Sequence, residues 1–305
     1  MTEFVSSSSR APSALFAGLC TLDLIQSVIR VPHQNEKVTA LDQTVVAGGP
    51  ATNAAVTFAF LGGAAALVTG VGRHPLAEGI RADLAQAGVD LIDAAWADSR
   101  PPPVSSIVVT AGTGDRSVVS RNSAGRDLMP PPALRELTDQ ARAVLVDGHH
   151  PPLARAAVLA ARERGRPCIL DGGSWKDNLP DILPQVDVAV CSADFRPPGT
   201  VEDVLGYLLN RGIRWAAVTD GPRPVEWAGP EGRRGTVPVP VEEVTDTMGA
   251  GDVFHGAFTH AVATTGEGVI GEHTFISALR FAAKVAARSC RSFGTRAWMA
   301  APAAW

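Results

Sequence analysis

The segment Asp246-Thr-Met-Gly-Ala-Gly-Asp252-Val-Phe-His-Gly-Ala-Phe258 lies near the end of a chain of 305 residues. Its small residues Gly249, Ala250 and Gly251 lead into an apolar pattern with helical spacing over 253–261. The first turn of a helix leaves backbone N–H groups without partners, with the positive end of the helix dipole behind them. The segment therefore predicts an anion-binding loop at a helix N-terminus.

Asp252 follows this loop directly, where a carboxylate would repel a bound phosphate. A carboxylate in this position is suited to accept a proton from a hydroxyl group that attacks the phosphate. The alternative interpretation is a helix N-cap, because Asp is a favoured capping residue and glycine is common in loops. The complete string favours the catalytic interpretation and makes Asp252 the candidate general base.

The same string resembles the C-terminal signature of the ribokinase-like (PfkB-type) carbohydrate kinases, DTxGAGD followed by a helix of small residues. The resemblance implies that Asp252 is the catalytic base. It also implies that the backbone of Gly249, Ala250 and Gly251 holds the charge that develops on the transferred phosphoryl group, with ATP and Mg²⁺ as cofactors. The string GAGDVFHGA and the segment 279–290 are similar in character to those of ketohexokinase and sulfofructose kinase.

Composition describes a globular protein with enough apolar residues for a large core. Hydrophobic residues make up 46% of the chain and charged residues 19%, and the net charge is -4. This balance offers no electrostatic basis for nucleic-acid binding. The four cysteines are far apart and fit neither a Cys-x-x-Cys metal site nor a disulfide framework, so we expect reduced thiols in a cytoplasmic protein.

Two segments imitate membrane or export signals. Residues 43–72 contain no charged side chain, but Gly48-Gly49-Pro50 and Gly62-Gly63 divide them into a turn, a helix and a strand. The N-terminal serines precede only a short apolar run, which continues as a strand-like segment. We therefore expect no membrane association, a disordered tail over 1–12 and a single kinase domain over 13–305.

Strand-like apolar runs alternate with helical patterns along the chain. Predicted strands lie at 14–18, 64–71, 143–146, 167–170, 186–191 and 215–219, and predicted helices at 51–61, 76–87, 152–164, 202–211, 251–264 and 274–290. This alternation favours an α/β fold, in which a mostly parallel central sheet is covered by helices on both faces.

Residues 26–47 and 104–122 depart from this alternation. Ser105–Thr110 and Arg116–Ser120 are β-branched, half-polar segments on either side of a glycine-containing turn, which predicts a β-hairpin. We expect these strands to form a small sheet over the mouth of the main domain. The resemblance implies that this sheet is a β lid that closes over the sugar, and that two lids pack together in a homodimer.

The second informative motif is Gly48-Gly49-Pro50-Ala-Thr-Asn53. Two glycines before a helix allow close approach of the backbone to a ligand, and Asn53 offers a donor and an acceptor to a polyol. A tight turn with capping explains the motif about as well. The resemblance implies that Gly49 and Asn53 bind the substrate, together with Asp23 at the end of the first strand and Asn122 after the second lid strand.

Candidate nucleotide-binding residues follow from the resemblance. Val218-Thr219-Asp220-Gly221 matches a strand-end motif that contacts the nucleotide phosphates and ribose, which makes Thr219 and Gly221 candidates. Ala283 occupies a position on the helix that the family places beside the adenine.

The cation ligands are less well defined. The Asn-x-x-Glu motif that the family links to magnesium is absent near Cys191–Phe195, where Asp194 is the available carboxylate. The resemblance implies a potassium site formed by Asp246, Met248 and the loop around Gly294. A simple turn role for Asp246 is equally consistent with the sequence.

These features predict an ATP-dependent kinase that phosphorylates a primary hydroxyl group of a sugar, either a ketohexose or a pentose-like sugar. A nucleoside kinase of the same family is one alternative, and a non-catalytic sugar-binding protein on the same fold is another. The absent Asn-x-x-Glu motif favours the second alternative, whereas the intact Asp252 motif argues against it. A dinucleotide-dependent oxidoreductase is disfavoured because no Gly-x-Gly-x-x-Gly follows the first strand. The sequence does not name the sugar.

Overall fold

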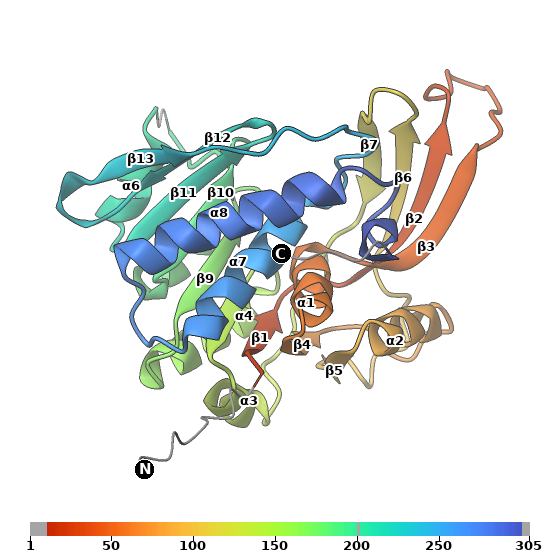
Figure 1. The fold of residues 1–305 in the computed structure, drawn as a ribbon. Coiled ribbons are helices and arrows are strands. Elements are labelled where there is room, and N and C mark those ends of the chain that lie inside the picture. The colour runs from red at the N-terminus through yellow and green to blue at the C-terminus, as the bar shows by residue number, and fades with distance from the viewer. Residues whose placement is uncertain (1–10, 200–201, 301–305) are drawn as a thin grey trace, which may run out of the picture.

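A computed structural model describes residues 11–199 and 202–300, which form an α/β unit with two sheets (Figure 1). Within these residues, the larger sheet has nine strands in the order β13-β12-β11-β10-β9-β8-β1-β4-β5. From β11 to β5 all neighbours run parallel, whereas β12 and β13 form an antiparallel edge. The strands are β1 (Ser13–Ala17), β4 (Ala64–Thr69), β5 (Val89–Asp93), β8 (Ala143–Val146), β9 (Cys168–Gly172), β10 (Val188–Ser192), β11 (Trp215–Asp220), β12 (Arg223–Ala228) and β13 (Arg234–Val237).

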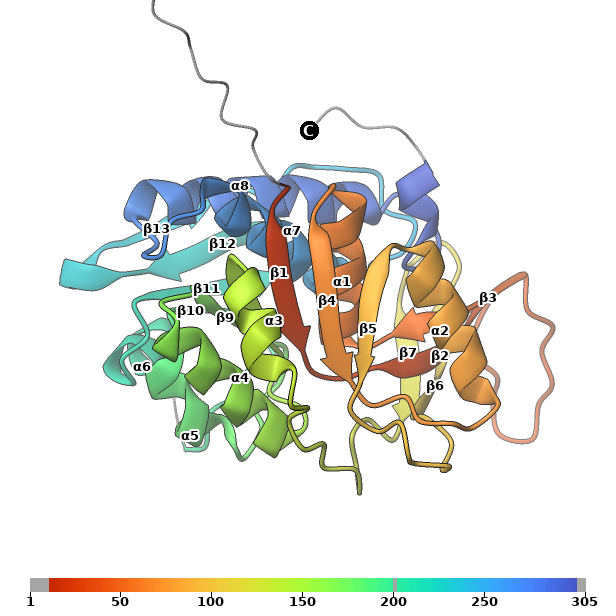
Figure 2. The same cartoon turned by 90° about the horizontal axis from the view of Figure 1, so that it is seen from below.

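Helices cover both faces of this sheet (Figure 2). On one face lie α1 (Pro50–Phe60), α7 (Ala250–Thr265) and α8 (Glu272–Ser289), and on the other lie α3 (Leu134–Gln140), α4 (Pro151–Glu163), α5 (Leu179–Ile182) and α6 (Val204–Asn210). Helix α2 (Leu76–Gln86) packs beside β5 at the end of the sheet. Short 3₁₀ turns occupy Leu183–Gln185, Pro230–Gly232 and Ala297–Ala300.

The core consists of two apolar layers, one on each side of the large sheet. Successive residues of a strand point to opposite faces, so Phe16 joins Phe58 and Phe258 on the α7 side while Leu15 packs with the α4 helix. Strands buried on both faces explain the continuous apolar runs that the sequence shows.

Helices α1 and α7 cross closely because residue 256 is glycine. A Cβ atom built on Gly256 would lie 2.4 Å from the carbonyl oxygen of Ala54, closer than any real side chain tolerates. This contact brings the first turns of the two helices together. Asn53 of α1 and Asp252 of α7 therefore become neighbours although they are 199 positions apart.

A second sheet stands beside the first. In the described part of the chain it has four strands in the order β3-β2-β6-β7: β2 (Thr21–Val28), β3 (Asp42–Gly48), β6 (Val104–Thr110) and β7 (Arg116–Ser120). Ile25, Val46 and Ile107 form a small core on its inner face. On the opposite face Val45 and Val119 are 48% and 75% exposed. We call this sheet the lid sheet, after the family feature that it resembles.

The structure confirms the predicted fold class, with its parallel sheet, helices on both faces and small additional sheet. The strand β5 and the antiparallel pair β12 and β13 were not predicted, because they are short, half-polar strands at the two ends of the sheet and have no continuous apolar run. Residues 1–10 of the expected tail lie outside the described residues. In the described ranges, every helix is too short or too polar to cross a membrane.

Candidate active site

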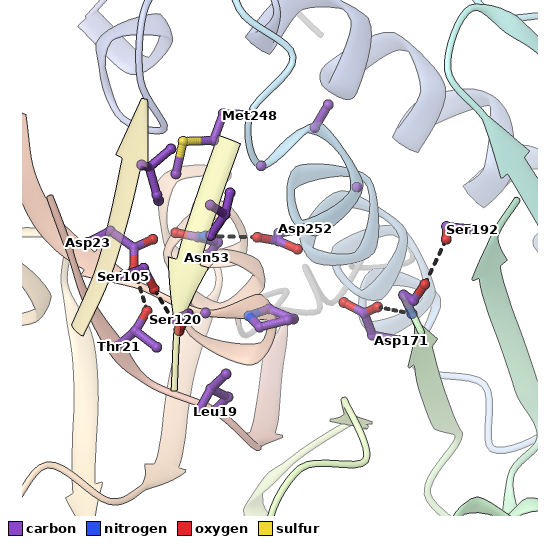
Figure 3. Close-up of a pocket in the computed structure, with 18 of the residues that line it drawn as sticks. Leu19, Thr21, Asp23, Asn53, Ser105, Ser120, Asp171, Ser192, Met248 and Asp252 are labelled. Atoms are coloured by element: carbon purple, nitrogen blue, oxygen red, sulfur yellow. Dashed lines mark hydrogen bonds between the residues drawn. The ribbon is translucent and has the colours of Figure 1, made fainter. Parts of the chain in front are cut away.

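A cavity of about 360 Å³ lies between the inner face of the lid sheet and the large sheet (Figure 3). Its walls come from β2, β6 and β7, from the first turns of α1 and α7, and from the carboxyl ends of β9, β10 and β11. The carboxyl edge of a parallel sheet is where ligands bind in open α/β folds, and this volume is typical of small-molecule sites.

Asp252 and Asn53 point toward one another at the centre of this cavity (Figure 3). The Asn53 Nδ2 atom donates a hydrogen bond to Asp252 Oδ2 at 2.8 Å. The Asn53 Oδ1 atom accepts from Arg296 Nη1 at 2.9 Å, and Arg296 Nη2 also donates to the carbonyl oxygen of Ala47 at 2.6 Å. Because Arg296 can only donate, it fixes the amide so that the NH₂ group faces the carboxylate.

Asp23 lies across the cavity from Asp252 (Figure 3). Thr21 Oγ1 donates to Asp23 Oδ1 at 2.5 Å, and a Cβ atom on Gly48 would lie 1.9 Å from Asp23 Oδ2. Gly48 is therefore required by this carboxylate, whereas the φ of 97° at Gly49 requires the second glycine of the pair. Burial raises the pKa of Asp23, against the lowering effect of hydrogen bonds from Thr21 and Ser105.

The segment that the sequence predicts as an anion loop forms the N-terminus of α7. Gly249 has a φ of 71°, in the left-handed region that favours glycine, and no side chain caps the N-terminus of α7. Nothing lies within 4 Å of a Cβ atom built on Gly251. The N–H of Ala250 donates to the carbonyl oxygen of Thr247 at 3.3 Å, and the space beside Gly251 leaves room for an anion at this helix N-terminus.

Burial raises the pKa of Asp252, and repulsion from Asp171 raises it further. The Asp252 side chain reaches the cavity at one edge and is otherwise surrounded by protein. The hydrogen bond from Asn53 opposes this rise of the pKa. Asp252 therefore accepts a proton more readily than an ordinary aspartate does.

One side of the cavity, which the sequence predicts to bind the nucleotide, is formed by strand ends. Ser192 and Thr219 line it at the ends of β10 and β11, and the side chain of Asp194 is exposed. Of the sequence candidates, Gly221 lies outside the lining and is exposed. Ala283 is 2% exposed and packs in the core on α8, so the structure does not bring it to the cavity.

The remaining candidates divide into cavity residues and neighbours of the anion loop. Gly49 and Asn122 line the cavity. Asp246 accepts hydrogen bonds from the backbone N–H groups of Met248 and Gly294, each at 2.9 Å. The three predicted potassium ligands are thus adjacent, although Asp246 here binds backbone donors. In the described ranges, no group of three or more His, Cys, Asp or Glu side chains could hold a metal ion.

The family of this fold and site is identified by comparison. The model of the pfkB family carbohydrate kinases matches residues 12–302. The chain belongs to this family. It is therefore a carbohydrate kinase of the pfkB type, and the sequence resemblance is confirmed over almost the whole length.

Curated relatives of this pfkB kinase are ribokinases and a ketohexokinase. It is 28% identical to the ribokinase of Bacillus subtilis over 296 residues, which cover 92% of this chain and 94% of the relative. It is 29% identical to the ketohexokinase of Mus musculus over 105 residues, and this match spans about a third of each chain, 34% and 35%.

Solved structures share the fold at lower identity. The ribokinase of Giardia lamblia superimposes with a TM-score of 0.81 at 18% identity, covering 95% of this chain and 96% of the other. The Arabidopsis thaliana ribokinase complexed with ribose and ATP gives a TM-score of 0.73 at 20% identity, with 93% and 94% covered. Adenosine kinase from Sinorhizobium meliloti gives 0.74 at 20% identity, with 94% and 96% covered.

Three charged residues in or near the cavity, Asp147, Asp171 and Arg296, were not predicted from the sequence. Asp147 and Asp171 each directly follow or end an apolar strand, and this strand-end position is the signal that could have found them. Asp147 accepts from the N–H groups of Leu19 and Ala51 and so joins the segment after β1 to the first turn of α1. Arg296 has no such signal, since it lies in an irregular C-terminal segment.

Asp147 is buried, and nearby positive charges and backbone donors stabilise its ionised form. Burial would raise the pKa of Asp147, but the charges of His149 and Lys176 and the backbone N–H of Leu19 lower it well below its usual range. A Cβ atom on Gly18 would lie 2.2 Å from Asp147 Oδ1. Asp147 thus fixes the backbone around the acceptor side and does not line the cavity.

Proposed function

We propose that this pfkB kinase transfers the γ-phosphoryl group of ATP to a primary hydroxyl group of a sugar, a ketohexose or a pentose-like sugar. The observation that carries the proposal is the position of Asp252. It lies beside the uncapped N-terminus of α7, where an anion can bind, and accepts a hydrogen bond from Asn53. Asn53 and Asp23 line the same cavity with polar groups that can bind sugar hydroxyl groups. A base and an anion site within one cavity are what this reaction needs.

In the proposed step, Asp252 accepts the proton of the sugar hydroxyl group. The hydroxyl oxygen forms a bond to the γ-phosphorus, the bond from that phosphorus to the bridging oxygen breaks, and ADP leaves with the electron pair. The N–H groups at the start of α7, from Gly251 and its neighbours, stabilise the charge on the transferred group. Asp23 and Asn53 orient the sugar by accepting and donating hydrogen bonds, with Gly49 and Asn122 completing the wall.

Magnesium fits this site as a companion of the ATP phosphates. Mg²⁺ typically binds through substrate phosphates, one or two carboxylates and retained water molecules, so it needs no cage of protein ligands. Asp194 is the carboxylate on the nucleotide side that could supply such a contact, and it lines the cavity together with Thr219. The ion would neutralise phosphate charge. We further propose that potassium binds at Asp246, Met248 and Gly294, next to the anion loop.

The lid sheet is proposed to close over the sugar and to form a homodimer. Its inner face lines the cavity through Ser105, Ile107 and Val118, so closure would exclude water from the reaction. Its outer face exposes Val45 and Val119. Two such faces related by a two-fold axis would cover each other in a self-complementary interface.

A cytoplasmic location is also part of the proposal. All four cysteines are free, and Cys20, Cys168 and Cys191 are buried. Free thiols are typical of a reducing compartment, which is also where ATP is available.

A phosphorylation screen tests the proposal. The purified protein is incubated with Mg²⁺, K⁺ and ATP and, in turn, with ketohexoses, aldopentoses, sulfofructose and nucleosides, and ADP release is measured. Phosphorus NMR then locates the phosphate on the product. We expect a sugar ester of a primary hydroxyl group, absent with the Asp252→Asn variant as control. A nucleoside as the best acceptor would favour the alternative kinase, and turnover of no acceptor would overturn the proposal.

A further inference from the structure

His255 occupies an unusual environment in α7, one turn after Asp252. The residue is buried and lines the cavity. The ring Nδ1 atom lies 2.7 Å from the carbonyl oxygen of Gly251, and Nε2 lies 3.0 Å from the carbonyl oxygen of Val190 in β10. Both ring nitrogens therefore face groups that can only accept hydrogen bonds.

A neutral imidazole cannot satisfy both contacts, because it has one N–H donor and one nitrogen lone pair. In either tautomer, a lone pair of His255 would face a buried carbonyl oxygen at hydrogen-bond distance, which is unfavourable. The imidazolium ion donates from both nitrogens and satisfies both oxygens. The geometry thus favours the doubly protonated ring.

A buried cation needs a nearby anion, and Asp171 supplies it. Asp171 Oδ2 lies 3.3 Å from His255 Nδ1. Both side chains are buried, with 4% of Asp171 and 5% of His255 exposed. Asp171 Oδ1 accepts from the N–H of Gly173 at 3.1 Å, whereas in the part of the chain that is described Oδ2 accepts no hydrogen bond. An ion pair with the ring accounts for this otherwise unsatisfied oxygen.

We propose that His255 is a positioning residue that is held as an imidazolium ion and neutralises Asp171, so that Asp252 alone carries the negative charge available to accept the proton of the substrate. The inference rests on the proposed function, since it concerns how the base of that reaction is kept ionised. Without the positive charge, two carboxylates would share one buried site.

Other charged groups surround Asp171, Asp252 and His255. Asp23 of β2 and Arg296 of the C-terminal segment act on Asp252, and Asp147, His149 and Lys176 act on Asp171. Arg296 is engaged by Asn53 and Asp83, and Asp147 by His149 and backbone N–H groups. His255 is thus the cation in direct contact with Asp171 and on the same helix as Asp252.

The consequence concerns the pH dependence of the rate. Burial and Asp171 already raise the pKa of Asp252, so activity should be lost as the pH falls through this raised value. Loss of the imidazolium charge of His255 would raise the pKa of Asp252 further. The acid limb of the kcat/KM profile should therefore move to higher pH in His255→Gln, by about 1–3 pH units.

Removing the charge of each member of the pair, singly and together, provides the decisive comparison. Asp171→Asn removes the repulsion, so its acid limb should move to lower pH, and the double variant His255→Gln with Asp171→Asn should lie near the wild type. His260→Gln is the matched control, because His260 is on the same helix and packs between Phe58 and Phe281 outside the cavity. An acid limb that is the same in His255→Gln and wild type would overturn the proposal.

A measurement without turnover separates this inference from the proposed function. In wild-type protein labelled with ¹⁵N-histidine, NMR should find both His255 ring nitrogens protonated at about pH 7, where a free histidine is mostly neutral. The His255→Gln spectrum assigns the signals. If one ring nitrogen carries no proton, the inference fails even when the kinase is active. If no acceptor is phosphorylated but both nitrogens are protonated, only the proposed function fails.

Discussion

The proposed acceptor side and the proposed nucleotide side of the cavity are built differently. On the acceptor side, hydrogen bonds join Asn53 to Asp252 and Arg296, residues that lie 199 and 243 positions away along the chain. On the proposed nucleotide side, Ser192 Oγ donates to the carbonyl oxygen of Gly173 and accepts from the backbone N–H of Asp194, and Thr219 Oγ1 donates to the carbonyl oxygen of Cys191, so these bonds stay among nearby strand ends. One side is cross-linked through the tertiary structure, and the other consists of exposed strand ends.

This difference indicates which contacts exist before the ligands bind. Groups that are already oriented lose little conformational entropy on binding and contribute most when the reacting atoms must be aligned. Asn53 cannot rotate its amide without breaking the bond to Arg296, whereas Asp194 is exposed and free to adapt. We therefore expect large effects from substitutions on the acceptor side and small ones on the nucleotide side.

The largest effect is expected for the base. Asp252→Asn keeps the size of the side chain but cannot accept a proton, so the turnover rate should fall by about two to four orders of magnitude. Sugar affinity should change little, because the amide still accepts the hydrogen bond from Asn53. Steady-state kinetics with calorimetry measure both quantities. A variant that keeps more than about a tenth of the wild-type rate would contradict the assignment.

The next effect concerns sugar binding. Asp23→Ala and Asn53→Ala each leave hydroxyl groups of the buried sugar without a partner, which should weaken binding by about 1–3 kcal/mol. Titration calorimetry measures the loss, and ATP affinity provides the internal control because neither residue lies on the nucleotide side. Unchanged sugar affinity in both variants would move the acceptor site elsewhere.

The lid sheet offers a pair of neighbouring valines with opposite orientations. Val118 lines the cavity, whereas Val119 is 75% exposed on the outer face. Val119→Asp should lower dimer affinity by more than tenfold, since a charge in an apolar interface costs more than about 1.4 kcal/mol. Val118→Asp should instead weaken sugar binding. Light scattering and calorimetry separate the two, and a monomeric wild type with full activity would exclude the dimer.

A smaller effect is expected for the monovalent cation. Potassium at Asp246, Met248 and Gly294 would stabilise the anion loop that these residues hold, so its replacement by a bulky organic cation should lower the rate several-fold. Rates are compared at constant ionic strength and saturating ATP. Equal rates in both salts would remove the site.

The smallest effect is expected on the nucleotide side. The exposed Asp194 contributes through a solvated contact, and such contacts are typically worth about 0.2–1 kcal/mol. Asp194→Asn should therefore raise the KM for MgATP by no more than about fivefold and leave sugar affinity unchanged. An effect as large as that of Asp252→Asn would mean that the two sides of the cavity do not differ as proposed.

Much of the fold was predictable because its signals are local. The runs at Ala143–Val146 and 167–170 are apolar throughout, which is typical of strands buried on both faces, and the structure has strands there. The pair β12 and β13 was missed because strands near the end of the sheet are only partly buried and carry a weak apolar pattern. Ala283 was predicted at the nucleotide site but is buried in the core. Its place on a predicted helix does not reveal which face of that helix meets the cavity.

The sequence alone determined the family and the α/β class, and it predicts the anion loop and the base Asp252, because each of these signals depends on residues adjacent in the chain. Only the tertiary structure decided that Arg296 fixes the amide of Asn53, that Gly48 makes room for Asp23 and that His255 lies between two carbonyl oxygens beside Asp171. These contacts join distant segments. Hydrogen bonds and charges act over a few ångströms in space, and no local pattern encodes which segments come that close.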